Sequence, residues 1–228
     1  RHKPKVFSFN SRFVVLCNVS VIIIATISFY FLEGHKSLAA DESIYGRWVS
    51  SLFMANSSRS AGFNSIDLNF INVPTLIMLV TLMWVGVSPG STGGGVKVTT
   101  VAVALLNVFS LARGKESIEI NKRRIASESV NKAFAIIWLS ILTIAFSFIL
   151  LNFSEPDQEM MPLLFETVSA YTTCGLSLGI TASLSASSKI ILMFTMFVGR
   201  VGMLTLLVAF IKNTKNKSYI YPTEKVLF

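Results

Sequence analysis

Two uninterrupted apolar runs limit what this chain can fold into. They cover residues 13–32 (FVVLCNVSVIIIATISFYFL) and 133–151 (AFAIIWLSILTIAFSFILL). The hydrocarbon core of a bilayer needs about 20 largely apolar residues per helix, so each run is long enough to cross it. Two further apolar runs, 74–111 and 189–211, are interrupted by glycines and, in the second, by a charge. The sequence therefore predicts an all-α membrane protein with four crossings.

The composition supports a membrane protein and argues against other classes. Of the 228 residues, 52% are hydrophobic and 14% are charged, whereas an ordinary soluble domain carries about a quarter charged residues. The net charge of +8 resides in short segments between apolar runs, which does not favour nucleic-acid binding. Cys17, Cys174, His2 and His35 are too few and too far apart for a disulfide framework or a metal site. We expect no cofactor in this chain.

The distribution of charge predicts the orientation. Segments 1–12, 112–132 and 212–228 hold four, six and four of the twenty basic residues. Because Lys and Arg in short loops stay in the cytoplasm, both termini are predicted to be cytoplasmic. The predicted organisation is a cytoplasmic basic segment (1–12), a first pore repeat with a broken second span (13–111), a cytoplasmic linker (112–132), a second pore repeat (133–211) and a cytoplasmic tail (212–228).

The two segments predicted to lie on the outer side, 33–73 and 152–189, each contain a helix too short to cross the bilayer. Residues 43–56 and 160–171 are amphipathic, and glycine-centred stretches, SSRSAGFN (57–64) and TTCGLS (172–177), follow them. Length alone would also fit helices lying on the membrane surface. Irregular backbone at membrane depth, however, is tolerated only where it is buried in protein or lines a water-filled path.

The order span, short helix, glycine-centred strand, span therefore occurs twice, with Gly62 and Gly175 in equivalent places. Each unit has two crossings, so the tandem repeats enter the membrane from the same side and are parallel. We interpret the short helices as re-entrant pore helices and the glycine-centred stretches as filter strands whose carbonyl oxygens replace the water around an ion.

The third apolar run is broken by SPGSTGGGVKVTT at 88–100. Neither a Walker P-loop nor a dinucleotide fingerprint is matched, because Val96 and Thr92 stand where lysine and glycine are required. A simple kink at Pro89 remains an alternative. We favour a helix that ends inside the membrane near residue 87, a glycine-rich gating loop beneath the filter, and a second helix from about residue 96.

Two charged residues accompany this loop. An arginine in an apolar span costs several kcal/mol unless it faces water or a polar partner, and Arg200 stands in the fourth run. It either projects into a pore below the filter or pairs with a carboxylate or helix carbonyls, and we favour the pore. Lys97 is expected to be a secondary gate residue. Glu166 is expected to brace the filter or add surface charge at the outer mouth, and Asn64 and Asp67 likewise.

Three motifs carry a family resemblance: SRSAGFN at 58–64, GSTGGGVKVTT at 90–100 and VGRVGMLTLL at 198–207. In this order they resemble the Trk/Ktr/HKT superfamily of potassium transporters, in particular the bacterial Ktr/Trk-type membrane subunit. Members carry four such repeats around one pore, so this chain resembles the third and fourth, the C-terminal half. The resemblance implies potassium as the transported ion, a missing N-terminal half, a homodimer in the bacterial inner (cytoplasmic) membrane, a cytosolic nucleotide-binding regulatory ring as partner, and no enzyme activity.

The resemblance also implies roles for particular residues. The implied filter residues are Ser60, Ala61, Gly62, Phe63, Thr173, Cys174, Gly175 and Leu176, which would hold potassium through backbone carbonyls. The implied gate residues are Gly90, Ser91, Thr92, Gly93, Gly94, Gly95, Lys97 and Arg200. Two alternatives stay open at this point: an ion-coupled secondary transporter that uses the broken helix as a substrate site, and a membrane-bound nucleotide-binding enzyme.

Overall fold

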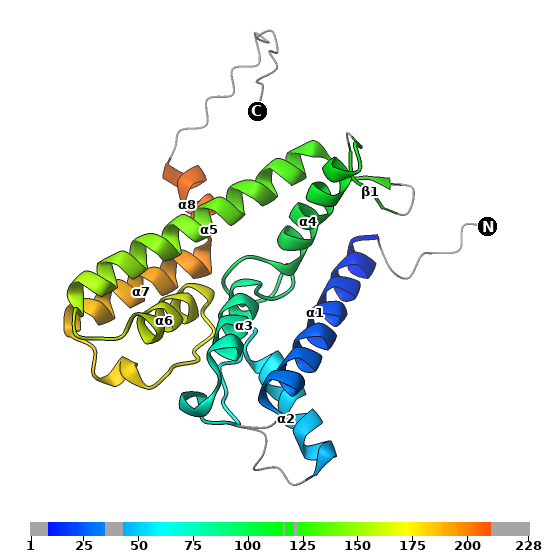
Figure 1. The fold of residues 1–228 in the computed structure, drawn as a ribbon. Coiled ribbons are helices and arrows are strands. Elements are labelled where there is room, and N and C mark those ends of the chain that lie inside the picture. The colour runs from blue at the N-terminus through cyan, green and yellow to red at the C-terminus, as the bar shows by residue number, and fades with distance from the viewer. Residues whose placement is uncertain (1–8, 35–42, 116, 121–122, 211–228) are drawn as a thin grey trace.

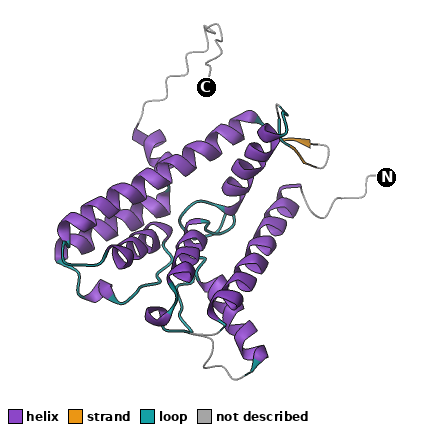
Figure 2. Cartoon of the chain, in the orientation of Figure 1, coloured by secondary structure: helices purple, strands orange, loops and turns teal. Residues whose placement is uncertain are grey.

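The computed structural model describes residues 9–34, 43–115, 117–120 and 123–210, and most of the two predicted terminal segments lies outside this part. Helices dominate the described residues, and loops gather between them near the centre (Figure 2). The elements are α1 (Phe9–Glu33), α2 (Ile44–Ser57), η1 (Leu68–Phe70), α3 (Val73–Trp84), α4 (Val98–Ala112), β1 (Glu119–Ile120), β2 (Arg123–Arg124), α5 (Ser127–Ser154), α6 (Met160–Thr172), η2 (Ile180–Ala182), α7 (Ala186–Val201) and α8 (Met203–Phe210).

The two uninterrupted apolar runs form the two longest helices, α1 and α5. By length and composition both can cross a membrane: an 18-residue stretch within 10–33 has a mean hydropathy of 2.3, and one within 127–154 has a mean hydropathy of 2.6. Large apolar side chains lie outward on both, and Phe31 and Phe153 are 74% and 81% exposed. Such surfaces are unfavourable in water and suit contact with lipid.

The other two apolar runs each form two helices. The third run divides into α3 and α4 around the glycine-rich loop. The fourth run, in which Gly199, Arg200 and Gly202 interrupt the apolar sequence, was counted as one span, and α7 continues through Gly199 and Arg200 and ends at Val201. Gly202 then adopts a φ of +85°, a conformation that glycine accepts without a Cβ clash, and α8 follows.

The helices form two units that share one core. In the first unit α1 contacts α2, α3 and α4, and in the second α5 contacts α6, α7 and α8. Contacts of α3 with α6 and of α4 with α5 join the units (Figure 1). The main hydrophobic cluster includes Met54 and Leu79 from the first unit and Phe165 and Leu176 from the second. The two repeats therefore fold as one body.

A buried carboxylate at the end of α1 caps the start of α3. Glu33 is completely buried, and its Oε1 accepts hydrogen bonds from the Asn72 backbone N–H (2.9 Å) and the Thr75 hydroxyl (2.5 Å). Asn72 is the N-cap of α3, whose first N–H groups have no partner within the helix. The carboxylate thus accepts a hydrogen bond from an amide that has no partner within the helix, and its negative charge interacts favourably with the positive end of the helix dipole.

The second unit repeats this arrangement. Glu155, next after α5, accepts hydrogen bonds from the backbone N–H of Ser185 (2.7 Å) and the hydroxyl of Ser188 (2.8 Å). Ser185 is the N-cap of α7, so both repeats use a glutamate at the end of the first helix in the same way. Ser185 follows Asn72 by as many residues as Gly175 follows Gly62.

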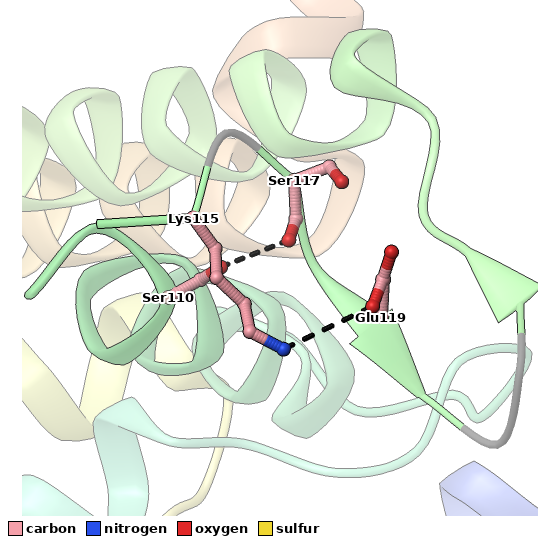
Figure 3. A network of polar contacts seen from close by, with 4 residues as sticks. All are labelled: Ser110, Lys115, Ser117 and Glu119. Atoms are coloured by element: carbon pink, nitrogen blue, oxygen red, sulfur yellow. Dashed lines mark hydrogen bonds and ion pairs between the residues drawn. The ribbon is translucent and has the colours of Figure 1, made fainter. Parts of the chain in front are cut away.

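The linker contains a feature that the sequence analysis did not predict. β1 and β2 form a short antiparallel hairpin in which Glu119 pairs with Arg124. Beside it the Ser110 hydroxyl donates to the Ser117 carbonyl (2.9 Å), and Lys115 Nζ lies 3.9 Å from Glu119 Oε2 (Figure 3). The predicted cytoplasmic linker thus contains a short pair of strands, whereas neither predicted filter strand pairs as a β-strand in the described residues.

The cap at Glu155 predicts a response to acid. Hydrogen bonds from the Ser185 backbone, the Ser185 hydroxyl and the Ser188 hydroxyl, in that order, lower the pKa of Glu155. Because its pKa is lower in the folded state, Glu155 stabilises the fold at pH values above the ordinary glutamate pKa of about 4.3. This contribution is lost as the pH falls through the lower, folded-state pKa. We expect the melting temperature of Glu155→Gln to change less than that of wild type between about pH 6 and about pH 3. Asp157→Asn, at an exposed neighbour, is the control, and equal changes in all three proteins would contradict the cap.

Candidate functional site

The two glycine-centred segments share one backbone pattern. After α2, Ser60 and Gly62 have φ angles of +97° and +71°; after α6, Thr173 and Gly175 have φ angles of +53° and +96°. The residue between each pair is not in this left-handed region. Alternating handedness of this kind can turn successive peptide groups in one direction. Positive φ is uncommon for serine and a genuine outlier for the β-branched threonine, and such strain concentrates at functional sites.

The two segments meet each other. A Cβ placed on Gly62 would collide with the carbonyl oxygen of Cys174 and lie 3.2 Å from the carbonyl carbon of Gly175. The Cys174 thiol lies 3.1 Å from the carbonyl oxygen of Ser58 and can donate to it. Glycines in equivalent positions of the two repeats therefore lie at a common centre, where no side chain separates the two backbones.

A serine from each short helix braces the segment that follows. The Ser57 hydroxyl accepts from the Phe63 backbone N–H at 2.8 Å, and the Ser57 carbonyl accepts from the N–H groups of Ala61 and Gly62, each at 3.0 Å. In the second unit the Ser169 hydroxyl accepts from the Gly175 N–H at 3.2 Å. These bonds satisfy backbone N–H groups that would otherwise be costly in apolar surroundings.

Glu166 holds the residues that follow the second glycine-centred segment. The side chain is buried within α6. Its Oε1 accepts from the Ser177 hydroxyl and from the Thr181 hydroxyl, the latter at 2.9 Å. This geometry is that of a brace. In the first unit Asp67 caps η1, accepting from the Asn69 backbone N–H at 3.0 Å.

The loop between α3 and α4 lies directly against both segments. A Cβ on Gly93 would collide with the Ser60 hydroxyl, and the Gly94 N–H donates to the Thr173 hydroxyl at 2.9 Å. Gly95, with a φ of +73°, lies against the Thr172 side chain. Three consecutive glycines are thus the part of the loop in closest contact with the two segments.

Two backbone hydrogen bonds hold the two ends of the loop together. The N–H groups of Val96 and Val98 donate to the carbonyls of Trp84 and Val87, both at 3.3 Å. The remaining predicted gate residues at the tip, Gly90, Ser91 and Thr92, are exposed. They lie apart from the contacts that the three glycines make.

Two cations accompany the loop, Lys97 at its end and Arg200 on α7. Lys97 Nζ donates to the Gly93 carbonyl, and the charge of Arg200 on α7 acts electrostatically on Lys97. Arg200 is exposed in this chain. It is placed there by Gly199, where a Cβ would collide with the Tyr171 carbonyl, so that α7 lies directly against the end of α6.

The sequence analysis predicted no role for Arg59. Arg59 is 5% exposed, and its Nη2 donates to Asn18 Oδ1 (2.6 Å) and to the Gly86 carbonyl (3.0 Å). Asn18 Nδ2 donates in turn to the Ser88 hydroxyl at 2.7 Å. This network links α1, the end of α2 and the start of the loop. In the sequence, the one indication of this network is Asn18, a polar residue within the apolar run at 13–32.

The long helices α1 and α5, with their exposed apolar side chains, are typical of an α-helical membrane protein. Residues 2–220 match the model of the TrkH family, described as "Cation transport protein". The chain belongs to the TrkH family, which confirms the resemblance carried by its three motifs.

Named relatives and a solved structure agree with this family. Ktr system potassium uptake protein D of Bacillus subtilis is 33% identical over 227 residues, and Ktr system potassium uptake protein B of Vibrio alginolyticus is 35% identical over 234 residues. Each alignment covers 100% of this chain and 50% of the relative, so the chain spans about half the length of these relatives. The crystal structure of the potassium transporter TrkH from Vibrio parahaemolyticus shares the fold, with a TM-score of 0.68 at 18% identity over 89% of this chain and 44% of that chain.

The buried position of Arg59 predicts a stability effect. Arg59→Met removes two charge-assisted hydrogen bonds and leaves Asn18 and the Gly86 carbonyl without their donor. We expect the free energy of unfolding of the protein to fall by about 3–6 kcal/mol, since two hydrogen bonds from a charged group are lost and each contributes about 1.5–3 kcal/mol. Arg12→Met, at an exposed position of α1, should change it by less than about 0.5 kcal/mol. Thermal unfolding in detergent measures both, and equal stability of the two variants would contradict a structural role for Arg59.

Proposed function

We propose that this chain forms half of the pore of a potassium uptake protein. The contact between Gly62 and the Cys174–Gly175 backbone carries the proposal, because it brings two equivalent backbone segments to one centre. The related Ktr proteins are named as potassium uptake proteins. Carbonyl and hydroxyl oxygens are hard ligands that suit an alkali cation and can replace its water shell.

The two short helices support a cation at this centre. α2 and α6 both end immediately before their glycine-centred segments. The C-terminal end of a helix carries a partial negative charge, so both helix dipoles favour a cation there. In this proposal α2 and α6 are re-entrant pore helices, and the segments 60–63 and 173–176 are two sides of the selectivity filter. Glycine at both 62 and 175 favours potassium over sodium by family resemblance.

The filter is open on one side of this chain. Ala61, Phe63 and Gly175 are exposed, and Phe63 is 69% exposed. Two further repeats, in the half of the relatives that this chain does not match, would close the ring around the ion. The two repeats described here would be the third and fourth, parallel in the inner membrane, with both termini in the cytoplasm.

The loop at 90–97 acts as the gate in this proposal. It lies against Ser60 and Thr173 at the ends of both filter segments, where it would obstruct the path of an ion. Lys97 and Arg200 add positive charge beside it, which repels a cation while the loop is in place. Glycine-rich backbone can move out of the path with little steric hindrance.

The linker offers a surface for a cytoplasmic partner. Arg113, Lys115 and Arg124 are exposed around the β1–β2 hairpin. By family resemblance the partner is a cytosolic nucleotide-binding regulatory ring, and the transporter is a homodimer.

The filter assignment is tested by adding one methyl group to Gly62. In the full-length parent, Gly62→Ala drives a Cβ into the Cys174 carbonyl; overpacking of this kind costs about 1–3 kcal/mol, so potassium uptake should fall about tenfold or more. Gly114→Ala, at a similar φ of +69° with no atom within 4 Å, introduces the same backbone strain without crowding. Growth of a transport-deficient bacterium in potassium-depleted medium is the measurement. Equal growth with both variants would contradict the assignment of Gly62 to the selectivity filter.

The gate assignment is tested by shortening the loop. Deletion of Ser91 to Gly95 from the full-length parent removes the three glycines that contact both filter segments, together with two residues of the exposed tip, so potassium flux into proteoliposomes should rise. Flux is compared at equal amounts of inserted protein. If the correctly inserted deletion variant conducts no faster than wild type, the loop is not a barrier.

A further inference from the structure

The loop and the filter are joined by one hydrogen bond whose acceptor is a filter hydroxyl. We propose that the hydroxyl of Thr173 is a latch: it accepts the Gly94 N–H while the loop is closed and releases it when a cation occupies the inner end of the filter. This inference rests on the proposed pore function and assigns to Thr173 the coupling between ion and gate.

The backbone of Thr173 is set so that its hydroxyl reaches the loop. The neighbouring hydroxyls of Thr167 and Thr172 bond back to carbonyls of α6, those of Leu163 (2.7 Å) and Val168 (2.8 Å). Thr173 instead leaves the helix with a φ of +53°, and its Oγ1 lies 2.9 Å from Gly94 N. A β-branched residue in this conformation is strained, and strain of this kind persists where the surrounding structure holds it for a function.

The first repeat presents a hydroxyl in the equivalent place. Ser60 precedes Gly62 by two residues, as Thr173 precedes Gly175, and it also has positive φ. Its hydroxyl lies against Gly93, the residue before Gly94. Consecutive glycines of the loop therefore contact equivalent filter hydroxyls of both repeats, which places the loop symmetrically under the filter.

Close approach is a requirement of this contact. A Cβ on Gly94 would lie 2.9 Å from Thr173 Oγ1, 3.0 Å from the Thr172 carbonyl oxygen and 3.1 Å from the Gly199 carbonyl oxygen. A side chain at position 94 would push the loop away from all three atoms. Glycine lets the amide itself reach the hydroxyl.

Electrostatics make the closed loop and an ion at Thr173 mutually unfavourable. The N–H of Gly94 points the positive end of its dipole at the same oxygen that a cation would use. A cation bound there would repel that N–H and compete for the lone pairs of Oγ1. Occupation of the inner filter therefore favours release of the loop, and closure of the loop disfavours occupation.

A double-mutant cycle in the full-length parent tests the latch. Thr173→Val keeps the shape and removes the hydroxyl, whereas Thr173→Ser keeps the hydroxyl and is the matched control. The ratio of potassium uptake rates, Val variant over Ser variant, is measured with the loop intact and with Ser91 to Gly95 deleted. The latch predicts a ratio about fivefold higher with the loop intact, which corresponds to one hydrogen bond of ordinary net strength.

Equal ratios in the two backgrounds, with normal uptake by wild type, would overturn the latch and leave the proposed pore intact, because Thr173 would then act on the ion alone. Failure of the wild-type parent to take up potassium would overturn both. A second measurement covers poor insertion of the Val variant: the rate at which a thiol reagent modifies Val96→Cys, at a loop position that is completely buried while the loop is closed, corrected for the parent's own cysteines. Potassium should accelerate this modification in wild type and in Thr173→Ser, and the same rate with and without potassium would also overturn the latch.

Discussion

The structure depends on one constraint: two irregular stretches of backbone meet inside an apolar bundle, and their polar groups must be satisfied there. The serines at 57 and 169 meet this need by accepting backbone N–H groups of the segments that follow them. With those donors engaged, Gly62 can lie against the carbonyl of Cys174 without an intervening side chain. The candidate filter, the loop beneath it and the surrounding helices are all packed around this contact.

The two units have the same order of elements but differ in what packs beside equivalent residues. Glu33 and Glu155 cap the next helix in the same way in both units. Gly86 and Gly199 are separated by the same number of residues as Gly62 and Gly175, yet a Cβ on Gly86 would approach the carbonyl of Gly94 at 2.8 Å, whereas one on Gly199 would collide with Tyr171. The space beside the equivalent glycine is thus taken by the returning loop in the first unit and by α6 in the second.

The sequence predicted well where one dominant force sets the outcome. Apolar length alone predicts α1 and α5, and the glycines at 93–95 predict the break between α3 and α4, which the structure places at residues 85–97. The sequence alone did not decide which glycine divides the fourth run, because glycines stand at both 199 and 202. Gly202 ends α7, whereas Gly199 lies within the helix, where a Cβ would collide with the Tyr171 carbonyl. The hairpin at 119–124 gave no clear signal because each strand has only two residues.

By itself the sequence determined the apolar helices, the doubled order of elements and the family, because the length of an apolar run and the spacing of glycines depend only on residues close together in the chain. Only the tertiary structure decided that Arg59 is buried against Asn18 and Gly86, and that Gly94 reaches Thr173. Both depend on atoms far apart in sequence, the latter pair by 79 residues. A contact of this kind is selected by the packing of whole helices, and no pattern of neighbouring residues encodes it.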